Sequence, residues 1–345
     1  MPTTIVRNRL PLRCLVLVAV WVAGRLPAAV AADPGSDAAV VARVGDTPIG
    51  WPQLEAALLR GNVPAMPAGP QRQLAEAVAL EKLVDEILLQ GVVDKEGVKV
   101  DPAVVDASIA QLQKQIKDRG GTFATFLTMT HRTEAELRRQ ATLELAVRQF
   151  VAQRVTPQAV ETYFAKHRRE LDGTLIRASH LVLRPDLGRG DVAVDECLAR
   201  AAILRGRILQ GEITFAEAAR AHSAGPSRRR GGDVGFMPRY SLAHDEFAKQ
   251  AFSISKGDIS KPFVTPSGVH IMQVTDAQEG SKTLDGLRAQ IEQTLAQETV
   301  RDTLAEARRT TAIEYGPGVV HFDPATPPAG SAPRRVVVEP QPGGR

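Results

Sequence analysis

The stretch Leu-Ile-Arg-Ala-Ser-His-Leu-Val-Leu at residues 175–183 decides how this chain is organised. Leucine and β-branched residues dominate it, and Gly173 and Pro185 bound it, which predicts a β-strand. Residues 71–170, which precede it, have apolar residues at helical spacing instead. The change of pattern predicts that a second domain, built partly from strands, begins here.

The segment before this strand is predicted to be helical almost throughout. A helix over 71–90 has a regular apolar face, and Gly91 follows it at the position of a C-cap. A short hairpin is predicted over 40–50, around a Gly-Asp turn. Three more helices are predicted from their N-terminal signals: Asp101-Pro102, the capping box Thr133-x-x-Glu136, and Thr156-Pro157.

After the strand, the pattern alternates between helices and strands. The predicted elements are a helix near 192–209, a capping box Thr214-x-x-Glu217, a glycine-rich turn at 231–235, a helix near 245–252, and strands near 261–265 and 268–275. Helical spacing returns over 284–309, and 311–315 is predicted as one more strand. The tail over 324–345 is rich in Pro, Gly and Ala, which predicts disorder.

Length and composition favour an ordinary globular protein of about two domains. The chain has 345 residues, of which 43% are hydrophobic and 24% charged, and this excludes collagen-like, wholly disordered and multi-spanning membrane proteins. Only 4% of the residues are aromatic. The core must therefore be built mainly from Ala, Leu, Val and Ile.

The first thirty-one residues are typical of a cleaved export signal. Arg7, Arg9 and Arg13 form a positive segment, an apolar run follows from Cys14 to Gly24, and Ala-Val-Ala ends the segment at Ala31. Eleven apolar residues are too few for a membrane anchor, which needs about 20. We therefore expect the mature protein to be periplasmic, or secreted if the host has a single membrane.

Loss of this segment changes the charge and the cysteine content. Its four arginines are its charged side chains, so cleavage takes the formal net charge from +4 to zero and leaves no basic field for nucleic acid. Cys197 becomes the sole cysteine, which excludes an intramolecular disulfide. Because Cys197 lies in a helical pattern with no histidine at a motif spacing, we expect it to fill the core.

Residues 177–277 resemble the parvulin family of peptidyl-prolyl cis/trans isomerases over that family's whole domain length. Six ordered blocks carry the resemblance: Ala178 to Val182, Phe215 to Ala219 with Ser223, Gly231 to Phe236, Glu246-Phe247 to Ala251-Phe252, Gly257 to Ser260, and Thr265 to His270. Residues 40–170 resemble more weakly the helical part of exported chaperone-isomerases of the SurA and PrsA type.

The resemblance implies an α+β fold in which a parvulin domain is inserted into a helical chaperone-like module. The expected boundaries are a signal peptide at 1–31, a helical module at 38–172, a parvulin domain at 174–278 with an antiparallel sheet and surrounding helices, a C-terminal helix and strand at 281–316 that complete the helical module, and a disordered tail at 324–345. The module would thus be discontinuous in sequence.

The resemblance also assigns site residues. It implies that His180 and His270 are paired imidazoles, that Ser267 and Thr265 hold their tautomers, and that Phe247, Val234 and Leu242 form a slot for the proline ring. It implies no cofactor and no metal. One position departs from the family pattern, because Gly225 stands where a Cys or Asp is usual, two residues after Ser223. The missing polar group could lower the activity by a few kcal/mol of transition-state stabilisation.

Other chemistry is not indicated. Arg228, Arg229 and Arg230 form a charge run that we interpret as solvated rather than as a phosphate site. Metal-binding, nucleotide-binding and hydrolase motifs such as His-Glu-x-x-His, Cys-x-x-Cys, a Walker loop and Gly-x-Ser-x-Gly are missing from the sequence.

Three functions remain open from the sequence. The leading hypothesis is an exported peptidyl-prolyl isomerase that acts on unfolded or folding polypeptides with X-Pro bonds in the envelope. The second is a non-catalytic holdase chaperone whose parvulin unit only binds peptides, and the third is an assembly subunit without clients. We expect no nucleic-acid partner and no stable membrane insertion after signal cleavage, and the alternatives of monomer and homodimer stay open.

Overall fold

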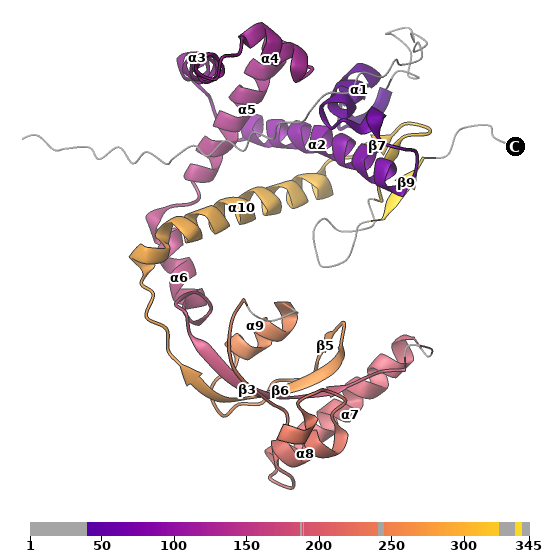
Figure 1. Cartoon of the computed structure of the whole chain (residues 1–345), viewed down its shortest axis with the longest axis vertical. Helices are drawn as coiled ribbons and strands as arrows, with labels where there is room; N and C mark the ends of the chain where they lie inside the picture. Colours follow the sequence, from indigo (N-terminus) through magenta and orange to yellow (C-terminus); the bar gives the residue numbers. More distant parts are fainter. Residues whose placement is uncertain (1–39, 187, 189, 241–244, 324–334, 340–345) are drawn as a thin grey trace, which may run out of the picture. The chain divides into compact units, whose positions relative to one another are not determined.

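The computed structural model describes residues 40–186, 188, 190–240, 245–323 and 335–339 (Figure 1). The predicted signal peptide and Leu242 lie outside these ranges. Contacts divide the chain into two compact units. The first unit contains 100–143 together with the described residues up to 95 and from 305, and the second contains 96–99 and 144–304. The domain boundaries expected from the sequence stay predictions.

A small antiparallel sheet in the first unit joins distant parts of the chain. Strand β1 (Val40–Val44) pairs with β2 (Thr47–Gly50) on one side and with β7 (Ile313–Tyr315) on the other, in the order β2-β1-β7. Val41, Val44 and Ile49 are buried in it. The predicted hairpin over 40–50 and the strand near 311–315 are thereby confirmed.

Five helices of the first unit follow this hairpin in the described chain: α1 (Trp51–Arg60), α2 (Pro70–Lys95), α3 (Pro102–Asp118), α4 (Phe123–Met129) and α5 (Glu134–Ala152), the last of which continues into the second unit. Their N-termini are held as the sequence predicts. The Asp101 carboxylate accepts a hydrogen bond from the backbone N–H of Ala103 at 2.9 Å, and Thr133 and Glu136 form the capping box.

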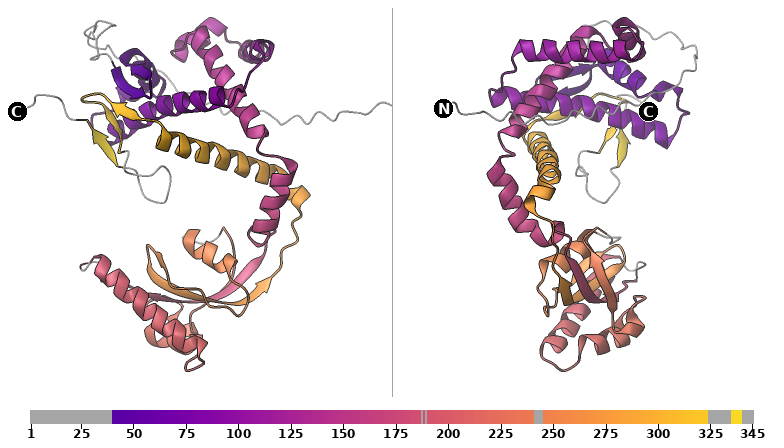
Figure 2. Two further views of the ribbon diagram at one scale, coloured as in Figure 1. Left: turned by 180° about the vertical axis from the view of Figure 1, so that it is seen from behind. Right: turned by 60° about the vertical axis from the view of Figure 1, so that its left-hand side comes forward.

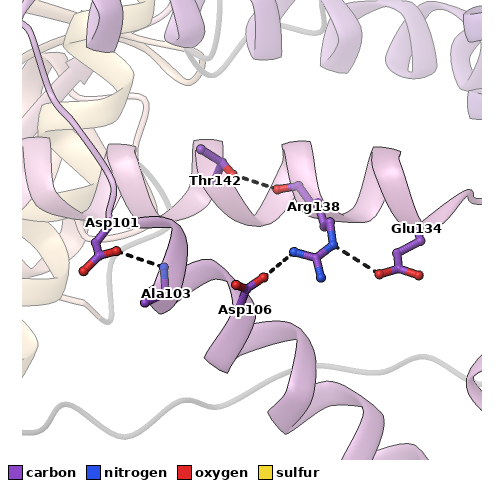
Figure 3. A network of polar contacts seen from close by, with 6 residues as sticks. All are labelled: Asp101, Ala103, Asp106, Glu134, Arg138 and Thr142. Carbon is purple, nitrogen blue, oxygen red and sulfur yellow. Dashed lines mark hydrogen bonds and ion pairs between the residues drawn. The ribbon is translucent and has the colours of Figure 1, made fainter.

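Polar contacts join α3 to the start of α5 (Figure 3). The Arg138 guanidinium donates to the carboxylates of Asp106 on α3 and Glu134 on its own helix. Thr142 in turn donates its hydroxyl to the backbone carbonyl of Arg138 at 2.9 Å. The ion pair between Arg138 and Asp106 therefore joins the two helices.

Several expectations for this unit are wrong. Gly91 does not cap α2, which runs on to Lys95, because the burial of Val93 outweighs the cost of about 1 kcal/mol for a glycine inside a helix. Helices α1 and α4 were not predicted. The prediction of a disordered tail is also wrong at Val336–Val338, because these residues form strand β9, which pairs with β8 (Val320–Phe322).

The second unit contains a four-stranded antiparallel sheet with helices on both faces (Figures 1 and 2). The strand order is β4 (Asp233–Pro238), β3 (Leu175–Leu183), β6 (Gly268–Gln278) and β5 (Phe263–Thr265). The strands predicted from the sequence are confirmed, but residues 233–235 of the predicted turn belong to β4.

The two faces of this sheet bury different cores. Helices α7 (Asp191–Leu209) and α8 (Phe215–His222) pack on one face, around Leu181, Leu183 and Ile271, and Cys197 packs against the edge of that cluster. Helix α9 (Asp245–Ser253) covers the opposite face, with Phe247 and Phe252 among its buried residues. This second core surrounds the histidines that the sequence singles out.

Two further helices flank the sheet in the chain. Helix α6 (Pro157–Leu171) leads into β3, and its N-cap is the predicted Thr156. Helix α10 (Leu284–Thr310) follows β6, and its first half packs on α6 through Leu287 and Ile291. Within the described ranges, no helix has both the length and the apolar character needed to cross a bilayer.

Candidate functional site

Two histidines lie together on the face of the sheet covered by α9. His180 on β3 and His270 on β6 are diagonal neighbours, since His270 pairs with Val182 and His180 pairs with Met272. Their ring centroids are 5.7 Å apart and the rings are nearly parallel, at 16°. The sheet therefore brings together two imidazoles that are ninety residues apart in the chain.

Aromatic side chains enclose the two imidazoles. Phe247 on α9 points its ring edge-on at both, with centroid distances of 5.3 Å to His180 and 5.7 Å to His270. Phe263 on β5 stacks on His270 at 5.4 Å. Val234 and Met237 on β4 pack into the same apolar cluster. The sequence analysis missed Phe263 and Met237, because an apolar residue in a strand has no local feature that distinguishes it from other core residues.

A hydroxyl group contacts the deeper histidine. Thr265 Oγ1 lies 2.8 Å from His270 Nε2, and both residues are buried. The backbone N–H of Ser267 donates to the same Oγ1 at 3.1 Å, so the hydroxyl hydrogen can be directed at the imidazole. Thr265 is thus adjacent to His270 as expected, whereas a contact between the Ser267 hydroxyl and either imidazole stays a prediction.

His180 is held in an apolar environment. Burial lowers its pKa below the ordinary value for histidine, so the neutral imidazole is favoured at neutral pH. Its backbone N–H donates to the Gly232 carbonyl at 3.0 Å. Gly232 has a positive φ of 89°, and a Cβ there would lie 2.5 Å from the His180 carbonyl oxygen, so only glycine fits against this strand.

Gly225 lies directly against His180. A Cβ at this position would be 3.4 Å from His180 Nε2 and 3.0 Å from Val182 Cγ1. The buried Ser223 hydroxyl accepts hydrogen bonds from the backbone N–H groups of Val182 and Gly225, at 3.2 and 3.1 Å, and holds this segment to β3. A side chain at position 225 would therefore contact the imidazole, as the departure from the family pattern suggests.

The arginine run near the site has a structural use. The Arg228 guanidinium donates to the backbone carbonyls of Arg220 and Ala221, at 2.6 and 3.1 Å, near the C-terminal end of α8. Arg230 donates to the Asp233 carbonyl at 3.3 Å. These two arginines thus satisfy helix-end and loop carbonyls.

Comparison with known proteins gives this arrangement a family. Residues 180–276 match the rotamase family described as the PPIC-type PPIase domain. The chain contains a PPIC-type peptidyl-prolyl isomerase domain. The match includes both imidazoles, Gly225 and Phe247, and its first residue is His180 itself.

Proteins similar to this chain beyond the PPIC-type domain include chaperones. Over 216 residues the chain is 30% identical to a chaperone SurA of Vibrio cholerae, covering 61% of this chain and 49% of that protein. Over 260 residues it is 26% identical to a putative peptidyl-prolyl cis-trans isomerase SurA of Haemophilus influenzae, covering 69% and 81%. The chain thus spans about half the length of the Vibrio cholerae protein.

A solved structure of the peptidylprolyl isomerase PrsA from Bacillus anthracis is also similar. It has 21% sequence identity and a TM-score of 0.35, and the comparison covers 67% of this chain and 95% of that one.

A concave surface lies in the first unit, outside the PPIC-type domain. This groove has a volume of about 1250 Å³ and is lined by residues of β2, α1, α2 and α5 and of the segments between them. Its apolar lining includes Leu74 and Val78, both well exposed. Gln53, Gln71, Gln90 and Gln140 also line it, as do four basic and two acidic side chains: Arg60, Lys82, Arg132, Arg139, Glu86 and Glu136.

The polar content of the two surfaces bears on the ligands they could hold. In the described ranges, no three His, Cys, Asp or Glu side chains gather closely enough to hold a metal ion. The groove contains glutamine amides, a group whose donors and acceptor suit a peptide backbone, and of these Gln53 Oε1 accepts from the Gly50 N–H and Gln90 Nε2 donates to Asp94 within the protein. The site in the PPIC-type domain offers neutral imidazole and aromatic rings, which suit an apolar ring and an amide.

Proposed function

We propose that the chain is an exported peptidyl-prolyl cis/trans isomerase that assists the folding of envelope or secreted proteins. The observation that carries the proposal is the pair of stacked imidazoles of His180 and His270, enclosed by Phe247 in a PPIC-type domain. Similarity to the SurA proteins of other bacteria supports a role in protein folding. The export signal expected at 1–31 supports periplasmic or secreted clients.

The reaction requires no covalent step. Rotation about a peptide bond has a barrier of about 18–20 kcal/mol, and the enzyme lowers it by binding the twisted amide more tightly than either planar form. Each 1.36 kcal/mol of that preference is worth about tenfold in rate. The chain must therefore supply an apolar slot for the proline ring and a few fixed polar groups beside the rotating carbonyl.

The residues take these roles as follows. Phe247 and Val234 line the slot, together with Phe263 and Met237 from the same cluster. Leu242 and Ser267 keep the roles implied by the family resemblance, the first in the slot and the second beside the imidazoles. Thr265 orients the His270 imidazole through the contact with Nε2. His180 presents a neutral imidazole to the amide, since burial lowers its pKa.

Gly225 reduces the catalytic power in this proposal. A polar side chain there would lie against His180 Nε2 and could stabilise the twisted amide, and glycine supplies no such group. The expected penalty is about 1–3 kcal/mol, on the scale of one preorganised hydrogen bond. We therefore propose an isomerase of modest activity.

A holdase chaperone activity is the second candidate function, and the groove in the first unit favours it. Exposed Leu74 and Val78 in a groove of about 1250 Å³ could cover the apolar side chains of an unfolded segment. The glutamines could bind its backbone. In this case the first unit holds unfolded polypeptides whether or not the PPIC-type domain turns over proline.

The test compares mature protein with variants on a short unstructured X-Pro peptide by exchange NMR. Cis and trans signals that broaden with the wild-type protein, and broaden less with His270→Ala, support the isomerase. If the wild type causes no exchange, the isomerase is refuted, and exchange with Gly225→Asp alone then favours the non-catalytic holdase. A light-scattering assay of client aggregation measures the holdase separately, and equal affinity for folded and unfolded proteins would favour a subunit without clients.

A further inference from the structure

The last turn of α6 contacts the PPIC-type domain at several points. His167 has a non-helical φ of −110° and ψ of 18°, which breaks the helix one turn before its end. Residues 169–174, which we name the α6 junction, follow this break and lead into β3. The α6 junction lies entirely before residue 180, where the family match begins.

Glu170 makes a shielded ion pair across 69 positions of sequence. Its Oε2 accepts a hydrogen bond from Arg239 Nε at 2.8 Å, and its Oε1 lies 3.0 Å from His167 Nδ1. Only 12% of the Arg239 side chain is exposed. Burial would raise the pKa of Glu170, but the hydrogen bonds from Arg239 and His167 outweigh it and hold that pKa below its ordinary value.

The α6 junction contacts the ends of β4 and α9, the two elements that carry Val234 and Phe247 of the proposed slot. Arg239 directly follows β4, which carries Val234. One residue before Glu170, Arg169 Nη1 donates to the backbone carbonyl of Ile254 at 3.3 Å, just after the end of α9, which carries Phe247. Consecutive residues of the α6 junction therefore hold β4 and α9 at their ends.

The other end of the α6 junction holds the two strands that carry the imidazoles. The buried Asp172 carboxylate accepts hydrogen bonds from the backbone N–H and the hydroxyl of Thr174, at 2.9 and 2.6 Å, at the entry to β3. Its backbone carbonyl accepts from the N–H of Lys282 at 3.0 Å, and the Thr174 hydroxyl oxygen accepts from the N–H of Gly280 at 3.0 Å. The chain leaving β6 is thereby held to the chain entering β3.

We propose that the α6 junction positions the isomerase site, with Glu170 and Arg169 as positioning residues that act through Arg239 and Ile254. All four elements that carry His180, Val234, Phe247 and His270 are attached to it. A slot that must fit a proline ring depends on the spacing of its walls to well under 1 Å. The functional isomerase unit therefore begins at α6, before the family match. This inference rests on the proposed isomerase function.

Glu170→Gln in the full mature chain tests the proposal, with Glu161→Gln as the matched control. Glu161 is an exposed residue of the same helix. We expect kcat/KM for an X-Pro peptide to fall about tenfold in Glu170→Gln, mainly through KM, and to stay within twofold of wild type in the control. The double variant Glu170→Arg with Arg239→Glu exchanges the two charges of the ion pair, and it should recover most of the kcat/KM that Glu170→Gln loses.

The outcomes separate this proposal from the proposed function. If the wild type turns over the peptide and kcat/KM is the same in Glu170→Gln and Glu161→Gln, the positioning role is refuted. The proposed isomerase function is then retained. If wild type gives no turnover, the ¹⁵N signals of the His180 and His270 rings are compared on titration with the X-Pro peptide. The positioning role is also refuted if Glu170→Gln and the Glu161→Gln control then have the same ring signals and the same affinity for the peptide. If Glu170→Gln fails to fold, the double variant Glu170→Arg with Arg239→Glu is tested instead. The proposal is refuted if this double variant folds but its kcat/KM stays far below that of the wild type.

Discussion

The proposed proline slot in the PPIC-type domain and the groove in the first unit contain different kinds of side chain. Phe247 and Phe263 flank the slot with rings at fixed angles to the imidazoles, in a chain with 4% aromatic residues. The lining of the groove contains aliphatic, glutamine and charged side chains and, among the described residues, no aromatic ring. One surface is specialised and the other is adaptable.

Because the two surfaces differ in this way, one chain could bind the same polypeptide at two sites of different specificity. In the proposed function, rigid rings select one feature, the proline ring, because their geometry cannot adapt. Flexible aliphatic and glutamine side chains can cover many sequences at lower specificity. If this division is correct, mutations in one surface should leave the activity of the other unchanged.

Phe247→Ala should have the largest effect. Loss of the ring that contacts both imidazoles should lower isomerisation of a short X-Pro peptide about a hundredfold, since the slot loses one wall. The same change should cost about 3 kcal/mol of stability, because Phe247 is almost fully buried. Exchange NMR measures the first effect and urea denaturation the second.

Suppression of client aggregation should survive Phe247→Ala at a temperature where the variant is folded. Phe247→Leu is the control, since it keeps an apolar side chain in the cluster and should cost less stability. Equal loss of isomerisation and of aggregation suppression would show that the two surfaces do not act separately.

The double change Leu74→Glu and Val78→Glu should weaken the groove instead. Two carboxylates among the apolar lining residues should lower the affinity for an unfolded client about tenfold, because apolar contacts are lost and charge must be desolvated. Fluorescence anisotropy with an unfolded client segment measures the affinity. Turnover of a short X-Pro peptide should stay unchanged.

Val104→Glu is the matched control for the groove. Val104 is similarly exposed, at 46%, but lies on α3 and does not line the groove. If Val104→Glu lowers client affinity as much as the double change does, the groove is not the binding surface.

Features made by local hydrogen bonds could be predicted from the sequence. The capping boxes at Thr133 and Thr214 were found because each joins residues three positions apart. Strand β4 was missed, since its glycine-rich start has low β-propensity and the strand exists through its pairing with β3. Strand β9 likewise depends on β8, from which a predicted disordered segment separates it.

The candidate site divides in the same way. His180, His270, Thr265 and Phe247 were assigned from blocks of sequence that resemble a family, and the structure brings these four together. The pair of Glu170 and Arg239 could not be found, because the two residues are 69 positions apart and each has an ordinary charged neighbourhood in the sequence. Long-range ion pairs need the fold to identify them.

Gly225→Asp should raise the isomerase activity, by about fivefold. A carboxylate at this position would lie against His180 Nε2 and could accept a hydrogen bond from the imidazole N–H, which would orient the ring beside the rotating amide. The nearby Val182 methyl group must move by a few tenths of an ångström, since a Cβ at 225 would be 3.0 Å away.

Gly225→Ala provides the control for this increase. It introduces the same Cβ without the carboxylate, so its activity should be equal to or below that of wild type in the same exchange NMR assay. An increase with alanine would show that filling space, rather than the polar group, limits the slot.

The smallest expected effect is that of pH on the slot. Burial lowers the pKa of His180 in the folded protein below the value of about 6.5 in the unfolded chain. The stability that comes from keeping this imidazole neutral is therefore present above pH 6.5 and is lost as pH falls through the lowered pKa. Isomerisation should change less than twofold between pH 8 and 6.5 and decline below, while client binding to the groove should not follow this titration. Ring ¹⁵N shifts of His180 followed with pH give the test, and a midpoint at or above 6.5 would contradict an apolar slot around this residue.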